Sequence, residues 1–206
     1  MEKLKYKLTN NTINYQGHTL YRIIALKDFG DIKAGDFGGF VESGHNLSQS
    51  GNCWIFEGAK VYKEAEVFGN ARILGVAQIS DYAQIYGNTQ IYGNAQIFGD
   101  ARIEGNIRIS GNTKILGQTT IKNLEDISIE ISRSNQILNI GVLGSRNDCT
   151  TFFYSNNQIY VCCGCFTDTL NEFLLKVSKT HKGNVHFTNY ISAAKFAKEY
   201  LERNNK

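Results

Sequence analysis

The dominant hydrophobic pattern in this chain has a period of six residues. Residues 53–124 divide without a gap into twelve hexads such as AQIYGN, and the third place of every hexad is Ile or Val. The first place is mostly Ala or Thr, and the fifth is mostly Gly, often followed by Asn or Asp. Apolar positions of an α-helix recur at spacings of three and four, so a period of six excludes a helix here.

Each hexad predicts a short β-strand followed by a corner. The first and third places point to one side of the strand, and the second and fourth places point to the other. Gly-Asn and Gly-Asp pairs tolerate the positive φ of a sharp corner. Because so short a strand cannot bury its Ile alone, the hexads must stack into coils with a continuous interior. They predict a parallel β-solenoid in which the third-place residues, from Ile55 to Ile121, point inward.

The hexads resemble the hexapeptide repeats of left-handed parallel β-helices, in which three hexads make one triangular coil. That resemblance implies about four coils. The stretch LYRIIALKDFGDIKAGDFGGFVESGHNLSQSGNCWI further resembles the YdcK-like branch of this superfamily, and GVLGSRNDCTTFFY with VCCGCFTDTLNEF resembles a carboxyl-terminal module of its phage relatives. The expected fold is therefore mainly β: a left-handed parallel β-helix with an N-terminal β cap and a small C-terminal α+β module.

We divide the chain into a cap (1–52), a β-helix (53–131) and an α+β module (132–206). Residues 4–28 predict two or three short strands that lead toward the solenoid. The end of a solenoid exposes unpaired backbone, so capping is the favoured role of this segment. The alternative is a phosphate cradle at GDFGG, but that sequence matches neither Gly-x-Gly-x-x-Gly nor a P-loop.

After the hexads, SNQILNIGVLG, CTTFFYS and QIYVCCGCF predict three strands, the last two joined at Asn156-Asn157. The stretch TDTLNEFLLKVSKTHKG predicts a helix with a capping box of Thr169 and Glu172, and Gly183 ends it. Apolar spacing predicts a second helix over 191–203.

Charge and composition narrow the possible partners. The 206-residue chain has a formal net charge of +3 and no dense basic run, so duplex nucleic acid is not a favoured partner, while a small anion remains open. No stretch approaches the roughly 18 apolar residues of a membrane span, and no secretory signal is visible. Five cysteines, an odd number, suit a reducing compartment. We therefore expect a soluble, cytoplasmic protein.

The placement of histidine argues against the enzymes built on such repeats. An acyltransferase, the first activity that the resemblance implies, uses a histidine on or near the solenoid as general base. Residues 53–127 contain no histidine and no loop inserted between hexads. Zinc hydratases of this fold need three histidines there. The four histidines all lie outside the hexads, at His18, His45, His181 and His186.

Two short motifs are weaker candidates. Cys162 and Cys165 have C-x2-C spacing but no second close pair, so buried thiols are favoured over a zinc site. GSRND lies between two predicted strands and offers Arg146 and Asp148, either as a ligand-binding loop or as a plain polar turn. We keep Arg146 and Asp148 as candidate ligand-binding residues and assign no catalytic residue, metal ligand or cofactor.

The outward places carry the strongest ligand signal. With three hexads per coil, residues 18 apart stack on one face. One such face carries Trp54, Arg72, Gln90 and Arg108 in the second place and Phe56, Leu74, Tyr92 and Ser110 in the fourth. Arginine forks bind phosphate and aromatic rings stack on bases, so Trp54, Arg72, Tyr92 and Arg108 are candidate ligand-binding residues. A neighbouring face is less basic and carries Glu66, Gln84, Arg102 and Thr120.

Exposed aromatic residues on a flat sheet also indicate oligomer contacts. Related solenoids are usually trimers with ligand clefts between subunits, so both interpretations are compatible. Our leading hypothesis is a non-enzymatic homotrimer, encoded by a phage and located in the host cytoplasm. It would hold a small anionic ligand, and a nucleotide signal of bacterial immunity is one candidate by analogy. No membrane partner is expected. The alternatives are a hexapeptide-repeat acyltransferase and a structural protein that assembles through stacked coils.

Overall fold

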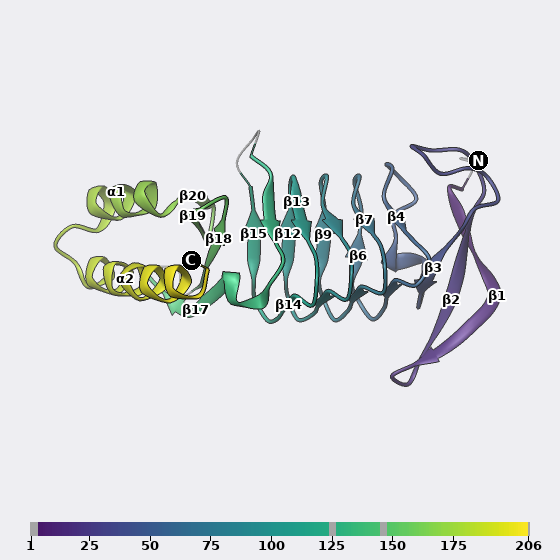
Figure 1. Cartoon of the computed structure of the whole chain (residues 1–206), viewed down its shortest axis with the longest axis horizontal. Coiled ribbons are helices and arrows are strands. Elements are labelled where there is room, and N and C mark those ends of the chain that lie inside the picture. The colour runs from purple at the N-terminus through teal and green to yellow at the C-terminus, as the bar shows by residue number, and fades with distance from the viewer. Residues whose placement is uncertain (1–3, 124–126, 145–147, 206) are drawn as a thin grey trace.

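The computed structural model describes residues 4–123, 127–144 and 148–205. They form a parallel β-solenoid of about five turns, with a β-hairpin at one end and an antiparallel sheet with two helices at the other (Figure 1). This confirms the predicted class, a mainly β chain built on a parallel β-helix with a small α+β module. Over the described ranges, no helix is long and apolar enough to cross a membrane.

Three sheets form the walls of the solenoid, and successive hexads contribute to successive sheets. Sheet A contains β1 (Tyr6–Tyr15), β2 (His18–Ala25), β3 (Phe37–Val41), β5 (Lys60–Val61), β8 (Gln78–Ile79), β11 (Gln96–Ile97) and β14 (Lys114–Ile115). Sheet B contains β4 (Trp54–Ile55), β7 (Arg72–Ile73), β10 (Gln90–Ile91), β13 (Ile107–Ile109) and β16 (Ile129–Ile131). Sheet C contains β6 (Glu66–Val67), β9 (Gln84–Tyr86), β12 (Arg102–Glu104) and β15 (Thr120–Lys122). Residues 18 apart are parallel partners, as three hexads per coil require.

The hexads account for four turns, and the flanking segments add a fifth. β3 pairs in parallel with β5, and Leu47 forms a parallel bridge with Val67, so residues before the first hexad build the first turn. At the far end, β16 pairs with β13. The four coils predicted for residues 53–124 are therefore confirmed, and the flanking segments extend the solenoid to about five turns. The extra positions were missed because Leu47 precedes Ile55 by eight residues and Ile131 follows Ile121 by ten, instead of six.

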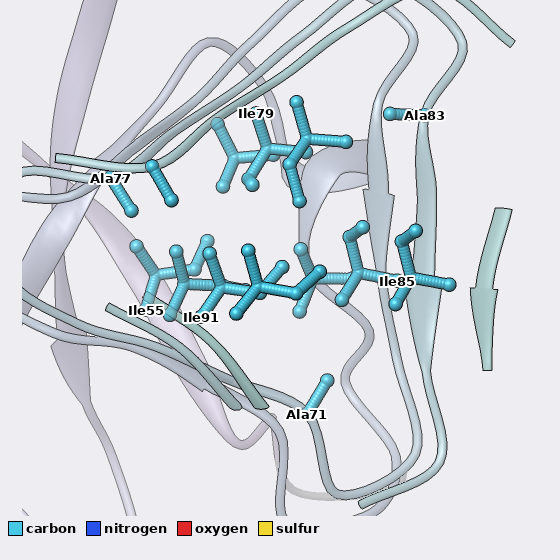
Figure 2. Packing of buried hydrophobic residues seen from close by; sticks show 14 of the residues in the cluster. Ile55, Ala71, Ala77, Ile79, Ala83, Ile85 and Ile91 are labelled. Atoms are coloured by element: carbon cyan, nitrogen blue, oxygen red, sulfur yellow. The ribbon is translucent and has the colours of Figure 1, made fainter. Parts of the chain in front are cut away.

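The interior is a set of stacked Ile and Ala side chains (Figure 2). All twelve third-place residues are at most 1% exposed. At the corners the backbones of successive turns nearly touch, which explains the repeated glycine. Gly75 has φ +66, and a Cβ there would lie 2.9 Å from the backbone nitrogen of Gly93. Glycine is thus required both by conformation and by space.

Two corners use Lys63 and Asp81 in place of glycine, although both have positive φ (55 and 61). Their side chains form an ion pair at 2.7 Å, and the Asp81 carboxylate also accepts the Gly99 amide at 3.0 Å. The Lys63 ammonium holds the pKa of Asp81 below its usual range. These contacts offset the strain of a side chain in the left-handed region.

The N-terminal hairpin covers the first turn. β1 and β2 pair antiparallel and extend sheet A beyond β3. Two side chains at the start of this hairpin donate hydrogen bonds to carbonyls of the first turn. The Tyr6 hydroxyl donates to the Leu47 carbonyl at 2.6 Å, and the Lys5 ammonium donates to the Cys53 carbonyl at 3.0 Å. The hairpin tip lies on the outside of sheet A, where the Tyr15 hydroxyl donates to Gln78 at 2.7 Å. These contacts support the capping role that we predicted for residues 1–52.

The C-terminal module contains sheet D and two helices. Sheet D has the order β17 (Ile137–Leu143), β18 (Asp148–Ser155), β19 (Gln158–Cys163) and β20 (Phe166–Thr169), and α1 (Leu170–His181) and α2 (Val185–Asn205) follow it. The single strand predicted for QIYVCCGCF is wrong, because Gly164 (φ +59) turns the chain and starts β20. The second helix begins earlier than predicted, since the Asn184 side chain accepts the Phe187 amide and caps it. Thr169 caps α1 as predicted.

Hydroxyl groups close this end of the solenoid. Amides of the last turn, one on each sheet, point toward the module and find a side-chain oxygen there. The Lys114 amide donates to Ser134 at 2.8 Å, the Thr120 amide to Thr151 at 3.1 Å, and the Glu130 amide to Ser155 at 2.9 Å. Backbone groups that would otherwise be buried without partners are thereby satisfied.

We expect Ile91→Asp to abolish folding. Ile91 is 0% exposed, so the variant loses its packing and buries a carboxylate, a combined cost of more than about 4 kcal/mol against a total stability of about 5–15 kcal/mol. The measurement is circular dichroism with urea unfolding. Gln90→Asp is the matched control, because its half-buried side chain lies on the outer face. A normally melting Ile91→Asp protein would contradict the solenoid.

Candidate ligand-binding groove

The face predicted to bind a ligand forms sheet B, but its first residue is covered. Trp54 pairs with Arg72 in the expected register, yet it is only 1% exposed. The rings of Tyr6 and Phe29 contact it edge-on, with centroids at 6.3 and 5.4 Å. Trp54 therefore belongs to the packing between the cap and the first turn, and no ligand can stack on it.

Arg72 is already bound to the protein itself. Its two terminal nitrogens donate to both oxygens of Asp31, at 2.5 and 2.8 Å, and its guanidinium lies 4.6 Å from the centroid of the Phe56 ring. The ion pair lowers the pKa of Asp31 and raises that of Arg72. Arg72 thus fastens the loop at residues 29–32 over sheet B.

The remaining predicted residues do not gather at one site. Arg108 is half exposed and lies 3.3 Å from Glu130, and Tyr92 is 40% exposed on the open part of sheet B. Arg146 lies outside the described residues. Asp148 begins β18 and borders a groove over a different wall, sheet C. The six candidates are therefore divided between two faces.

A groove of about 650 Å³ runs along sheet C. It is lined by His45, Glu64, Glu66, Tyr82, Gln84, Asp100, Arg102, Gln118, Thr120 and Asp148. Eight of these residues form two columns at 18-residue spacing. The corner column consists of Glu64, Tyr82, Asp100 and Gln118, and the strand column consists of Glu66, Gln84, Arg102 and Thr120. The first turn closes one end with His45, and the C-terminal module closes the other with Asp148.

His45 reaches the groove from a short 3-10 helix, η1 (Gly44–Asn46), which Ser43 caps. Its Nε2 atom lies 3.1 Å from a Glu66 oxygen and 3.9 Å from a Glu64 oxygen. Residues 53–127 do lack histidine, but the solenoid starts before Cys53. The expectation that no histidine lies beside the repeats is therefore wrong, because it counted only residues 53–127.

Arg102 differs from the two arginines of sheet B. It is exposed in the middle of the groove, and within the described part of the chain it has no ion-pair partner, whereas Arg72 and Arg108 each face a carboxylate. The fourth-place column beside it is internally paired: Phe68 stacks on Tyr86 with a centroid distance of 4.6 Å, and the Tyr86 hydroxyl donates to Glu104. Arg102 thus offers a guanidinium that is open to a ligand.

The stacking of Glu66, Gln84, Arg102 and Thr120 was visible in the sequence. We ranked that face lower because it is less basic, without knowing which face the cap covers. The corner residues Tyr82 and Asp100 follow the same 18-residue spacing, two residues before Gln84 and Arg102, so the period alone could have added them. The ends at His45 and Asp148 carried no such signal, because only the folded chain brings them to this face.

Comparisons with known proteins agree with the architecture. No family model matches the chain. The chain is similar to a protein described as "Uncharacterized acetyltransferase YdcK" from Escherichia coli (strain K12), with 47% identity over 38 residues. That segment covers 18% of this chain and 12% of the Escherichia coli protein. With the stacked strands, this similarity supports a hexapeptide-repeat β-helix, while the phage origin of the C-terminal module stays a prediction.

We expect Asp31→Asn to loosen the cap by about 0.5–1 kcal/mol at neutral pH, since the pair is partly exposed. The pKa of Asp31 is lowered in the folded state, so its stabilisation is present above about pH 4, the ordinary aspartate pKa, and is lost as the pH falls through the lower folded value. Urea unfolding at pH 7 and at acid pH measures this. Glu130→Gln, which removes the single longer contact with Arg108, is the control and should have a smaller effect at both pH values.

Proposed function

We propose that this chain is a non-enzymatic binding protein whose ligand lies in the sheet C groove. The observation that carries the proposal is Arg102, which has no ion-pair partner among the described residues and lies in the middle of a long polar groove that the first turn and the C-terminal module help to close. Sheet B is the weaker candidate for the ligand site, because Trp54 is covered by the cap and Arg72 is bound to Asp31.

The charges of the groove favour a ligand that carries both signs. Four carboxylates line it, from Glu64, Glu66, Asp100 and Asp148, against the positive charge of Arg102 and the imidazole of His45. A nucleotide would bring several negative charges among these carboxylates, and like charges in a confined site repel. A ligand with one anionic group, bound by Arg102, and a separate ammonium group, bound by the carboxylates, would complement the charges of the groove.

The spacing of the turns sets the length of such a ligand. Strands in a sheet are about 4.8 Å apart, so the two turns that separate Glu66 from Arg102 span about 10 Å. An extended tripeptide, at about 3.4 Å per residue, places its amino and carboxyl termini at a similar distance. Between the two charges, the exposed ring of Tyr82 and the amide of Gln84 offer apolar contact and hydrogen bonds. We therefore propose a short zwitterionic ligand of peptide-like length.

The test is an NMR titration with trialanine that has free termini. We expect Arg102→Gln to weaken binding by about 1.5–3 kcal/mol, the value of a hydrogen bond to a charged group. Arg108→Gln on sheet B is the matched control and should bind normally. Trialanine amide lacks the terminal carboxylate and should lose the binding energy contributed by Arg102. N-acetyl-trialanine lacks the terminal ammonium and should lose the binding energy contributed by Glu64 and Glu66.

Two results would contradict this proposal. Equal binding of trialanine by the wild type and by Arg102→Gln would remove the groove from recognition. Tight binding of mono-, di- or cyclic nucleotides would restore the anionic ligand that we expected from the sequence and would move the site to another face.

We also propose that the protein is a homotrimer. The solenoid exposes Tyr92 on sheet B, Leu116 on sheet A and Val76 at the corner between these two sheets, each at least 40%, and exposed apolar side chains of this kind suit subunit contacts. Light scattering should give three times the chain mass of 23.1 kDa. A stable monomer at micromolar concentration would contradict the trimer. A phage origin and a cytoplasmic location stay predictions, while the nucleotide ligand expected from the sequence is the alternative that the titration tests.

Acyl transfer is the second candidate, and one contact favours it. His45 lies against Glu66 at the mouth of the groove, and a carboxylate that orients a histidine is a common arrangement for a general base. The described activity of the Escherichia coli protein points the same way. Acetyl transfer from acetyl-CoA that is lost in His45→Gln would favour the enzyme over the binding protein.

A further inference from the structure

A lysine is buried where the cap meets the solenoid. Lys5 is 1% exposed, and its Nζ atom lies 3.0 Å from the Cys53 carbonyl and 3.4 Å from each of the Ser50 and Gly51 carbonyls. The ring of Phe29 covers it, with the centroid 5.1 Å from Nζ. Burial lowers the pKa of Lys5, which increases the share of the neutral amine at a given pH.

The same nitrogen contacts a free thiol. Lys5 Nζ lies 3.2 Å from the Sγ atom of Cys53, which is 0% exposed. The Sγ atom also lies 3.6 Å from the carbonyls of Ser48 and Ser50, so the sulfur is held on the side that faces the amine. A nitrogen that becomes nucleophilic when it loses its proton and an oxidisable sulfur thus lie at hydrogen-bond distance.

A small oxidant can come close to this pair. A groove of about 420 Å³ lies on the surface above it and is lined by Lys5, Lys27, Phe29, Gln49, Ser50 and Gly51, among others. The carbonyls of Ser50 and Gly51, two residues of the groove, lie 3.4 Å from the Lys5 nitrogen. The Cys53 sulfur does not line the groove itself, but it lies 3.2 Å from the nitrogen of Lys5, which does.

We propose that Lys5 and Cys53 form a reversible sulfur–nitrogen cross-link when the protein meets a peroxide. In the first step, the Cys53 thiol takes one oxygen from hydrogen peroxide, giving a sulfenic acid and water. In the second, the Lys5 nitrogen attacks the sulfur; the N–S bond forms, the S–O bond breaks, and the hydroxyl leaves as water with a proton from the nitrogen. Sulfenic acids condense with nitrogen in this way, and thiols reverse such products.

The cross-link would tie the start of β1 to the first hexad. Residues 5 and 6 already hold the carbonyls of Leu47 and Cys53, so a covalent bond at this point would lock the cap in its closed position. Closing a loop of this length also restricts the unfolded chain. The oxidised protein should therefore melt at a higher temperature than the reduced one. This inference is independent of the ligand in the sheet C groove.

The test uses the full chain with Cys149→Ser, Cys163→Ser and Cys165→Ser, which leaves Cys53 and Cys162 as thiols. After hydrogen peroxide, we expect an intact mass lowered by two hydrogens, a peptide that joins Lys5 to Cys53, and recovery of the original mass with a thiol reductant. Cys162 is the internal control. It is equally buried, but its sulfur contacts the Thr167 hydroxyl and the Lys122 carbonyl in place of an amine.

Two further samples separate this link from other products. Lys5→Arg keeps the positive charge without a nucleophilic amine and should give no peptide that joins residue 5 to Cys53. The parent chain oxidised in urea should give no such peptide either, although its two thiols can form a disulfide there. A mass loss in Lys5→Arg that maps to Cys53 without Cys162 would assign the bond to a backbone nitrogen and overturn the proposal. Unmodified Cys53, oxygen added without a link to Lys5, or a link that retains the oxygen would overturn it as well.

Discussion

The constraint on which this structure depends is the pairing of backbone groups between successive turns. Inside the solenoid each turn satisfies the next, but the first and last turns have one open side, and unpaired strand edges are costly and prone to association. The chain meets this with different chemistry at each end. The Lys5 ammonium and the Tyr6 hydroxyl donate to first-turn carbonyls, while Ser134, Thr151 and Ser155 accept last-turn amides. The end modules are thus parts of the same hydrogen-bond network as the repeats.

These end modules also decide which walls remain open. The loop that carries Phe29 and Asp31 covers the first residues of sheet B, and the hairpin tip lies on sheet A. Sheet C keeps an open groove, to which the first turn contributes His45 and the C-terminal module contributes Asp148. Covering the ends of the solenoid and shaping a polar surface along its side are therefore consequences of the same packing.

The repeats could be predicted from the sequence because each hexad encodes its own strand, corner and inward residue. The stacking of Trp54 on Arg72 followed from the 18-residue period and is correct. What could not be predicted is contact between distant segments. Asp31 and Arg72 are 41 residues apart, and no local pattern relates them. For the same reason His45 was assigned to the cap, although a parallel bridge two residues later places it beside the repeats.

Successive turns rise by equal steps, so the number of turns sets the length of the sheet C groove. Its two columns repeat every 18 residues, so removing or adding three hexads in the middle of the solenoid would keep the remaining strands in register. Such a change would shift the distance between His45 and Asp148 by one strand spacing, about 4.8 Å. The length of ligand that the proposed groove accepts would therefore change in discrete steps through recombination within the repeats.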